Sequence, residues 1–163
     1  MSLTYRLATP QDIAACIELR GKTRENSISV ERLRAKGVTL ESWSGDVAAD
    51  RLRGYVCVDD EKLIGYCFGD PSSGEILVLA ILPEGEGKGI GKRLLGMVVH
   101  NLAESGWRRL FLGCSPNANF RSYGFYRHLG WKATGTLDAA RDEVLEYFPA
   151  ESSNLAAADR TVE

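Results

Sequence analysis

The sequence predicts an α/β (α+β) domain, in which a mixed central sheet is flanked by helices. Residues 76–82 form an unbroken apolar run that is rich in branched side chains and too short to span a membrane, which is typical of a buried strand, here expected at 75–82. Apolar side chains then recur at helical spacing between Ile90 and Leu102, as on the inward face of a helix. Strand-like and helix-like segments occur on both sides of this pair, and such an order indicates helices packed on a sheet.

Before the apolar run we expect one strand, a series of short helices and a hairpin. Thr9-Pro10-Gln11-Asp12 is a helix start, because a capping residue is followed by proline at the first helical position. Asp59-Asp60-Glu61-Lys62 is a hairpin turn between two short strands. In order, the expected segments are a strand at 3–8, a helix from the cap to about 22, a polar link at 24–28, a helix at 29–37, a helical turn at 39–49, and strands at 55–58 and 63–68.

After the run we expect two helices and three strands. In order, these are a helix at about 89–105 that Gly106 ends, a strand at 109–114, a helix at about 118–129, and a final strand pair at 131–135 and 144–148. The tail from Ala150 is small and polar, and we expect it to be disordered. The predicted organisation is therefore a single domain over residues 1–149, followed by a disordered tail at 150–163.

Composition limits what the chain can do. With 163 residues, of which 44% are apolar and 26% charged, it has the balance of one globular domain. The formal net charge of −2 argues against a general nucleic-acid binder, which would usually be basic. The sequence has neither a signal-peptide pattern nor an apolar run of membrane length. We therefore expect a cytoplasmic protein with no nucleic-acid or membrane partner.

The cysteines and histidines do not indicate a metal site. The four cysteines are widely spaced, with no Cys-x-x-Cys pair and no histidine cluster beside them, which is typical of small buried side chains in a reducing cytosol. They are Cys16, Cys57, Cys67 and Cys114. Both histidines, His100 and His128, fall inside predicted helices. We expect no metal.

A glycine-rich turn joins the buried strand to the next helix. Gly85, Gly87, Gly89 and Gly91 occupy alternate positions, so the backbone can approach a ligand closely. The turn leads into a helix N-terminus, where unpaired N–H groups and the helix dipole both favour a phosphate. The alternative is a structural turn whose glycines permit close packing.

Two well-known phosphate-binding patterns do not match this turn. A Walker A loop would need glycine at position 86 and Ser or Thr at position 93, where the chain has Glu86 and Arg93. A Gly-x-Gly-x-x-Gly loop would need glycine at position 90 or 92, which Ile90 and Lys92 occupy. The sequence therefore favours neither a P-loop NTPase nor a Rossmann oxidoreductase.

Together with a second segment, the turn resembles the GNAT superfamily of N-acetyltransferases. The first family motif is Gln or Arg, two residues, Gly, one residue, and Gly or Ala; Gly89 and Gly91 match it, whereas Glu86 departs from it. About thirty residues on, segment 119–131 (NFRSYGFYRHLGW) is similar to the second motif. That motif is an Asn, a small residue three positions on, an aromatic–Tyr pair, and glycine before an aromatic residue. The resemblance covers residues 3–148.

The resemblance implies the GNAT fold and acetyl-CoA as cosubstrate. In that fold two central strands splay apart, here those ending near Ile81 and starting near Arg109, and the thioester arm of acetyl-CoA lies between them. An amide-bearing arm can pair with the backbone groups that the splay leaves open. The implied coenzyme-binding residues are Leu79, Ala80 and Ile81 for the arm, Gly87, Lys88, Gly89, Ile90, Gly91 and Lys92 for the pyrophosphate, and Asn119 and Tyr126.

The implied reaction is attack of an amine on a thioester carbonyl. It needs a neutral amine, stabilisation of the developing oxyanion and a proton for the departing thiolate. Tyr126 matches the family tyrosine that donates this proton; the alternative is a core aromatic whose hydroxyl is satisfied. Asn119 matches the asparagine that contacts the coenzyme arm, and it could also cap the helix.

The general base is open. Glu75 lies eleven residues before Glu86, an offset at which histone-acetylating family members have a glutamate base; the alternative is a surface carboxylate at a strand end. If Glu75 is not the base, Glu25, Asp70 or bulk water remain. Glu25 and Asn26 lie in the region that lines the acceptor pocket of family members, although they could be solvated loop residues.

Two functions from different classes follow. The first is an N-acetyltransferase that acts on a primary amine of a small molecule or peptide, with acetyl-CoA and the amine as partners; Tyr126 and Asn119 favour it. The second is an acyl-CoA-binding sensor or interaction module without catalysis. The sequence names no acceptor, because family acceptor sites are built from variable loops such as 22–50. A homodimer is left open.

Overall fold

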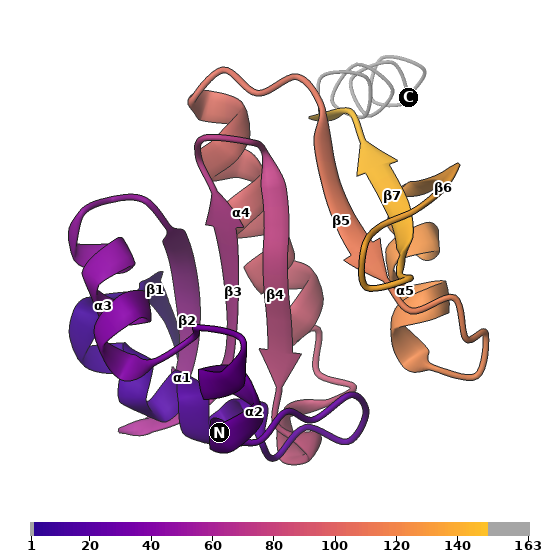
Figure 1. The fold of residues 1–163 in the computed structure, drawn as a ribbon. Helices are drawn as coiled ribbons and strands as arrows, with labels where there is room; N and C mark the ends of the chain where they lie inside the picture. The colour runs from indigo at the N-terminus through magenta and orange to yellow at the C-terminus, as the bar shows by residue number, and fades with distance from the viewer. Residues whose placement is uncertain (1, 150–163) are drawn as a thin grey trace, which may run out of the picture. The chain divides into compact units, whose positions relative to one another are not determined.

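The computed structural model describes residues 2–149, which fall into two compact units with the boundary between Val98 and Val99. In each unit, helices accompany a β-sheet (Figure 1), so the expected α/β class is confirmed. The single domain over 1–149 stays a prediction, and so does the splay between the strands near Ile81 and Arg109, because both concern the two units together. The expected tail at 150–163 lies outside the described residues.

The first unit contains an antiparallel sheet in the order β1-β2-β3-β4. Its strands are β1 (Leu3–Leu7), β2 (Arg53–Asp59), β3 (Lys62–Asp70) and β4 (Glu75–Ile81). In the β3–β4 register, Phe68 lies opposite Val78 and Gly69 lies opposite Ile76, so Leu77 is an extra residue on β4. This is a β-bulge, a feature that is over-represented next to active sites. The expected hairpin and the apolar strand are therefore confirmed.

Two helices of the first unit, α2 and α3, begin at side-chain caps. Ser29 Oγ accepts from Arg32 N–H (3.3 Å), and Thr39 Oγ1 accepts from Ser42 N–H (3.1 Å), which satisfies donors at each helix start. Arg6 donates two hydrogen bonds to the carboxylate of Asp12. These bonds lower the pKa of Asp12, although partial burial opposes the shift. The helices are η1 (Pro10–Asp12), α1 (Ile13–Arg20), α2 (Val30–Ala35), α3 (Leu40–Ala48), η2 (Pro83–Gly85) and the first part of α4 (Ile90–Glu104).

Strand β3 is buried between helices on both faces of the sheet. On one face, the rings of Tyr66 and Phe68 meet Trp43 of α3 edge to face, with centroids 5.7 and 5.3 Å from the indole. On the other face, a Cβ at Gly65 would lie 3.3 Å from Leu94 of α4. Aromatic contacts of this geometry add to the free energy gained from burial alone. The core of the unit therefore centres on β3, next to β4, which carries the residues predicted to contact the coenzyme arm.

The second unit contains strands in the order β5-β7-β6, with β7 antiparallel to both neighbours. Trp131 is buried and stacks on Tyr147 of β7, with ring centroids 5.2 Å apart. Arg109 Nε pairs with Glu146 Oε2 at 2.8 Å. Its elements after the end of α4 are β5 (Leu110–Cys114), α5 (Arg121–His128), β6 (Lys132–Leu137) and β7 (Glu143–Tyr147).

The start of α5 corrects the sequence prediction. A helix from about 118 was expected, but α5 begins at Arg121 with Phe120 as its N-cap residue. The preceding residues form a separate turn, in which Asn117 accepts from Phe120 N–H through its carbonyl (3.1 Å) and from Asn119 N–H through its side chain (3.0 Å). Asn side chains favour such local bonds over helical ones. The alternative of Asn119 as the helix N-cap is therefore wrong.

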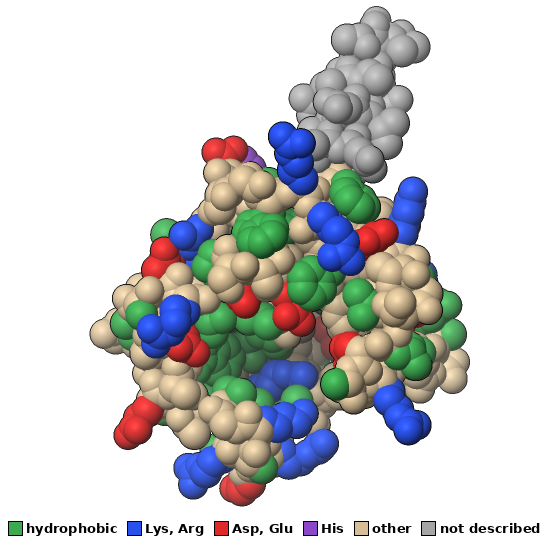
Figure 2. Space-filling model, turned by 45° about the horizontal axis from the view of Figure 1, so that its top comes forward, with side chains coloured by type: hydrophobic (Ala, Val, Ile, Leu, Met, Phe, Trp, Pro, Cys, Tyr) green, Lys and Arg blue, Asp and Glu red, His purple; other side chains and the backbone are tan. Residues whose placement is uncertain are grey.

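Other expectations concern the surface and the thiols. All four cysteines are buried free thiols, as expected. On the face drawn in Figure 2, acidic and basic side chains are interspersed, in keeping with the near-neutral net charge. Within residues 2–149, no helix has the length and apolar character needed to cross a membrane.

The contact between Gly54 and Phe68 predicts an effect on stability. A Cβ at Gly54 would lie 2.4 Å from Cδ1 and 2.7 Å from Cγ of Phe68, and the ring cannot move away without leaving its contacts with Trp43 and Tyr66. We expect Gly54→Ala to lower the free energy of unfolding by about 1–3 kcal/mol, as overpacked cores do, measured by urea denaturation.

The matched control is Gly45→Ala in α3, where a Cβ meets no atom within 4 Å; it should leave stability unchanged or raise it. Because Phe68 is the obstacle, Gly54→Ala combined with Phe68→Leu should cost less than the sum of the single changes. Additive costs would mean that the ring does not lie over Gly54.

Candidate functional site

The turn between β4 and α4 starts with a glycine that serves packing. Gly85 ends η2 and is buried, and a Cβ there would lie 2.6 Å from Cγ2 of Ile64. Leu82 N–H, just before η2, donates to the carbonyl of Ile64 at 2.9 Å. For Gly85, the close-packing alternative is therefore the one that the structure supports.

Gly87 and Gly89 are needed for their backbone conformation, whereas Gly85 is needed for packing. Their φ angles are +74° and +76°, which L-residues with a Cβ rarely adopt. Both glycines are exposed, and a Cβ on either would meet no atom within 4 Å. Their need for glycine is therefore conformational, and the space beside them is open.

This turn delivers the N-terminus of α4 as a set of donors. The carbonyl of Gly89 accepts from Arg93 N–H at 3.1 Å, which is the i→i−4 bond of an α-helix. The N–H groups of Ile90, Gly91 and Lys92 precede this bond, and the geometry of an α-helix gives them no acceptor inside the helix. The fifteen-residue helix adds its dipole at this end. The predicted pyrophosphate loop thus has the donors that an anion site needs.

The charged side chains of the turn pair with other parts of the first unit. Glu84 pairs with Lys62 of β3 (2.9 Å), and Glu86 pairs with Arg24 of the link before α2 (3.0 Å). Lys88 Nζ donates to the carbonyl of Glu84 (3.0 Å). Each acid of the turn thus has a cationic partner that comes from another element.

Arg93 and Tyr5 join the start of α4 to the first strand. The guanidinium carbon of Arg93 lies 4.0 Å from the ring centroid of Tyr5, the geometry of a cation–π contact. Arg93 therefore anchors α4 to β1, a role that the sequence did not indicate.

Strand β4 presents apolar side chains that are only partly covered. Leu79 and Ile81 are half-buried, Ala80 is buried, and Leu77 at the bulge is 44% exposed. Leu79, Ala80 and Ile81 are the residues predicted to contact the coenzyme arm, and Leu77 lies two positions before them. An exposed leucine at the middle of a strand leaves apolar surface that a ligand could cover.

The candidate bases lie at one end of the β3–β4 pair. Glu75 is half-buried at the start of β4, opposite Asp70. Burial opposes ionisation of Asp70, but hydrogen bonds from Ser72 and Ser73 outweigh it and lower the pKa of the carboxyl. A lowered pKa makes Asp70 a weaker base than an ordinary aspartate.

The link at 24–28 is a defined turn. Arg20 donates from its guanidinium to the carbonyl of Asn26 (2.5 Å) and accepts from Ile28 N–H (2.9 Å) at its own carbonyl. Asn26 is exposed with a φ of +56°, and Glu25 is half-buried. The turn brings Arg24 to Glu86, a contact between residues 62 positions apart.

In the second unit, α5 carries Tyr126. Its ring is half-buried and meets Phe125 and Trp131 edge to face, with centroids 5.0 and 6.1 Å away. The adjacent Arg127 stacks over the ring of Tyr123 (3.6 Å) and pairs with Glu143 of β7. These contacts fix α5 on its sheet and hold the backbone of Tyr126 in place. Asn119 is exposed in the turn before α5.

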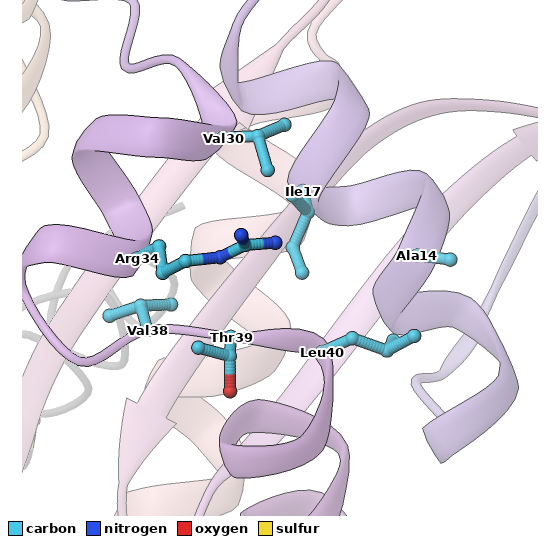
Figure 3. Close-up of a pocket in the computed structure, with 7 residues that line it drawn as sticks. All are labelled: Ala14, Ile17, Val30, Arg34, Val38, Thr39 and Leu40. Carbon is cyan, nitrogen blue, oxygen red and sulfur yellow. The ribbon is translucent and has the colours of Figure 1, made fainter.

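A separate hollow lies among α1, α2 and the start of α3 (Figure 3), with a volume of about 210 Å³. Its walls are mostly apolar, and the guanidinium of Arg34 extends across it toward Ile17. The lining residues are Ala14, Ile17, Val30, Arg34, Val38, Thr39 and Leu40. None of the predicted site residues lines this hollow, but most of its wall comes from the variable region at 22–50.

Comparison with known proteins agrees with the sequence motifs. The model of the acetyltransferase (GNAT) family matches residues 14–131, which confirms the resemblance. A search of curated proteins found no significant match.

Solved structures share the fold. PaiA N-acetyltransferase from Thermoplasma acidophilum, in complex with coenzyme A, has a TM-score of 0.77 and 22% identity, over 91% of this chain and 99% of that chain. YncA from Salmonella typhimurium, with its cofactor acetyl-CoA, has a TM-score of 0.67 and 18% identity, over 91% and 94%. Ribosomal-protein-alanine N-acetyltransferase from Brucella melitensis has a TM-score of 0.69 and 20% identity, over 89% and 99%. The expected fold is therefore confirmed.

The left-handed glycines predict a measurable strain. Gly89→Ala forces an L-residue to a φ of +76°, so it should lower the free energy of unfolding by about 1–2 kcal/mol. The control is Gly96→Ala, exposed in α4 with no atom within 4 Å of the added Cβ, which should raise stability by up to about 1 kcal/mol. Equal effects of the two changes in urea denaturation would contradict the loop conformation.

Proposed function

We propose that this chain, which belongs to the acetyltransferase (GNAT) family and is an acetyl-CoA-dependent N-acetyltransferase, acetylates a primary amine of a small molecule or peptide by direct attack. The observation that carries the proposal is the N-terminus of α4. There, two left-handed glycines lead into a helix start whose first N–H groups have no acceptor inside the helix, in an exposed turn whose acids are paired. Such a site suits the diphosphate of a coenzyme.

The acetyl-CoA thioester supplies an activated acetyl group, and the residues of the chain hold and polarise it. The N–H groups of Ile90, Gly91 and Lys92 would bind the diphosphate. The backbone of residues 79–81 would pair with the amides of the arm, as an added strand does. Backbone N–H groups near the thioester would stabilise the oxyanion that forms during attack.

The chemistry requires two proton transfers. As the amine nitrogen bonds to the carbonyl carbon and the C–S bond breaks, the amine must lose a proton and the thiolate must gain one. We assign the proton donor to Tyr126, which matches the family tyrosine and whose helix is fixed by Arg127. We assign the base to Glu75, acting through a water, because the lowered pKa of Asp70 disfavours that carboxylate.

We propose that the region at 22–50 determines which class of amine the protein accepts. Glu25 and Asn26 lie in a defined turn there, and we propose that they contact the acceptor. One structural neighbour is named a ribosomal-protein-alanine N-acetyltransferase, which supports including peptide amines among the candidates. The buried free thiols support a reducing, cytoplasmic location.

The direct test is release of free thiol from acetyl-CoA in the presence of a panel of amines. The panel should contain amino acids, polyamines and short peptides with free N-terminal amines. We expect amine-dependent thiol release with at least one class. Binding of CoA by calorimetry without turnover of any amine would favour the alternative of an acyl-CoA sensor.

Removing the hydroxyl group of Tyr126 tests whether this residue is the proton donor. We expect Tyr126→Phe to lower kcat by about 10²–10⁴-fold, with little change in the Kd for CoA, because only a transition-state interaction is lost. Tyr123→Phe on the same helix is the control and should keep kcat. If Tyr126→Phe turns over at the wild-type rate while chemistry is rate-limiting, the residue has only a packing role.

The pH dependence of Glu75→Gln tests the base. An alkyl ammonium ion is protonated near neutral pH and cannot attack, so loss of the base should depress kcat/KM there. Activity should recover partly at high pH, where free amine is more abundant. Asp70→Asn should have the smaller effect, because the lowered pKa of Asp70 makes it the weaker base. A pH–rate profile of Glu75→Gln that overlays the wild type would exclude Glu75.

A further inference from the structure

Glu86 is the position at which this chain departs from the coenzyme motif of its family, and the structure gives it a specific partner. Its side chain is 19% exposed, and its carboxylate oxygen Oε2 lies 3.0 Å from Nε of Arg24. The turn at 24–28 that carries Arg24 is fixed by two bonds to Arg20, one to the carbonyl of Asn26 and one from Ile28 N–H. The ion pair therefore joins two ordered turns within the first unit.

An unpaired carboxylate at this position would oppose the proposed ligand. Glu86 stands four residues before the first helical residue of α4, in the turn that would bind a diphosphate. Like charges a few ångströms apart repel strongly when they are partly desolvated. The glutamine or arginine of the family motif avoids this repulsion, whereas Glu86 introduces it.

We propose that Arg24 is a positioning residue for coenzyme binding: it neutralises Glu86 and so allows an acidic turn to accept the diphosphate. The inference rests on the proposed function, because it concerns the affinity of the same site for CoA. It also gives a role to the ion pair between Arg24 and Glu86, because Arg24 supplies a positive charge where Glu86 departs from the family motif. The partner Arg24 belongs to the same turn as Glu25 and Asn26, so the pair connects the coenzyme turn to the proposed acceptor region.

A double-mutant cycle tests this pair, with CoA as the probe and calorimetry as the measurement. Arg24→Gln should weaken CoA binding roughly tenfold, a change of about 1.4 kcal/mol, because the positive charge beside Glu86 is then lost. Glu86→Gln should bind CoA as tightly as the wild type or more tightly. The double variant Arg24→Gln/Glu86→Gln should return to within about threefold of the wild type. Arg24→Lys, which keeps the charge, should stay within about threefold as well.

Arg51→Gln is the matched control, because it also removes one positive charge and breaks an exposed ion pair, that of Arg51 with Asp46 at 2.8 Å. It should leave the Kd for CoA unchanged. The loss in Arg24→Gln should shrink at 0.5 M salt, since screening weakens the repulsion from Glu86. Thermal melts of each variant verify that the fold is kept.

The outcomes separate this inference from the proposed function. A wild-type Kd for CoA in folded Arg24→Gln would overturn the inference and leave the function intact. A double variant that binds CoA as weakly as Arg24→Gln would also overturn it, because Arg24 would then act without Glu86. Failure of the wild-type protein to bind CoA would overturn the proposed function, and the inference with it.

Discussion

Three backbone N–H groups at the N-terminus of α4 have no acceptor inside their helix, and the surrounding structure is organised to present them. A helix start of this kind needs an outside partner, usually water, a capping side chain or a ligand. Here, Gly87 and Gly89, at φ values of +74° and +76°, lead the chain into the helix. Because they have no side chains, they leave the space beside the helix start open. Below them, Gly85 packs against Ile64 of β3. The turn that leads to these N–H groups thus packs against β3, the most buried strand of its unit.

Electrostatics add a second constraint. A turn that is to accept a polyanion should not carry unpaired acids, yet this one contains Glu84 and Glu86. Lys62 and Arg24 pair with them, and each cation comes from an element far away in the sequence. The two acids of the turn are therefore neutralised only when the segments that carry Lys62 and Arg24 are folded against it. If the turn binds the coenzyme as we propose, the ion pair between Arg24 and Glu86 connects that binding to the 24–28 link.

Much of the order of helices and strands could be predicted from local sequence patterns. The apolar run at 76–82, the helical spacing after it and the cap at Thr9 predicted their elements correctly, because each pattern depends on neighbouring residues. The start of α5 was misplaced, since the side chain of Asn117 competes with helix formation in a way that periodicity does not reveal. The role of Gly85 depends on Ile64, and no pattern within the turn distinguishes it from Gly87.

The contact between Arg24 and Glu86 could not have been predicted either, because it joins residues 62 positions apart through a turn that Arg20 stabilises. The motif identified Glu86 as a departure and gave no sign of its compensation. The family and the reaction class, by contrast, were accessible from two short motifs, since the residues that contact a shared coenzyme change less in kind than those that contact an acceptor.

The central claim is that the N–H groups at the start of α4 bind the coenzyme. Hydrogen–deuterium exchange of residues 86–93, with and without saturating CoA, tests it most directly. In the free protein these amides should exchange rapidly, because the helix gives them no acceptor. The account predicts that CoA slows exchange at Ile90, Gly91 and Lys92, while amides of α3 are unaffected. Unchanged exchange in this segment, with CoA demonstrably bound, would contradict it.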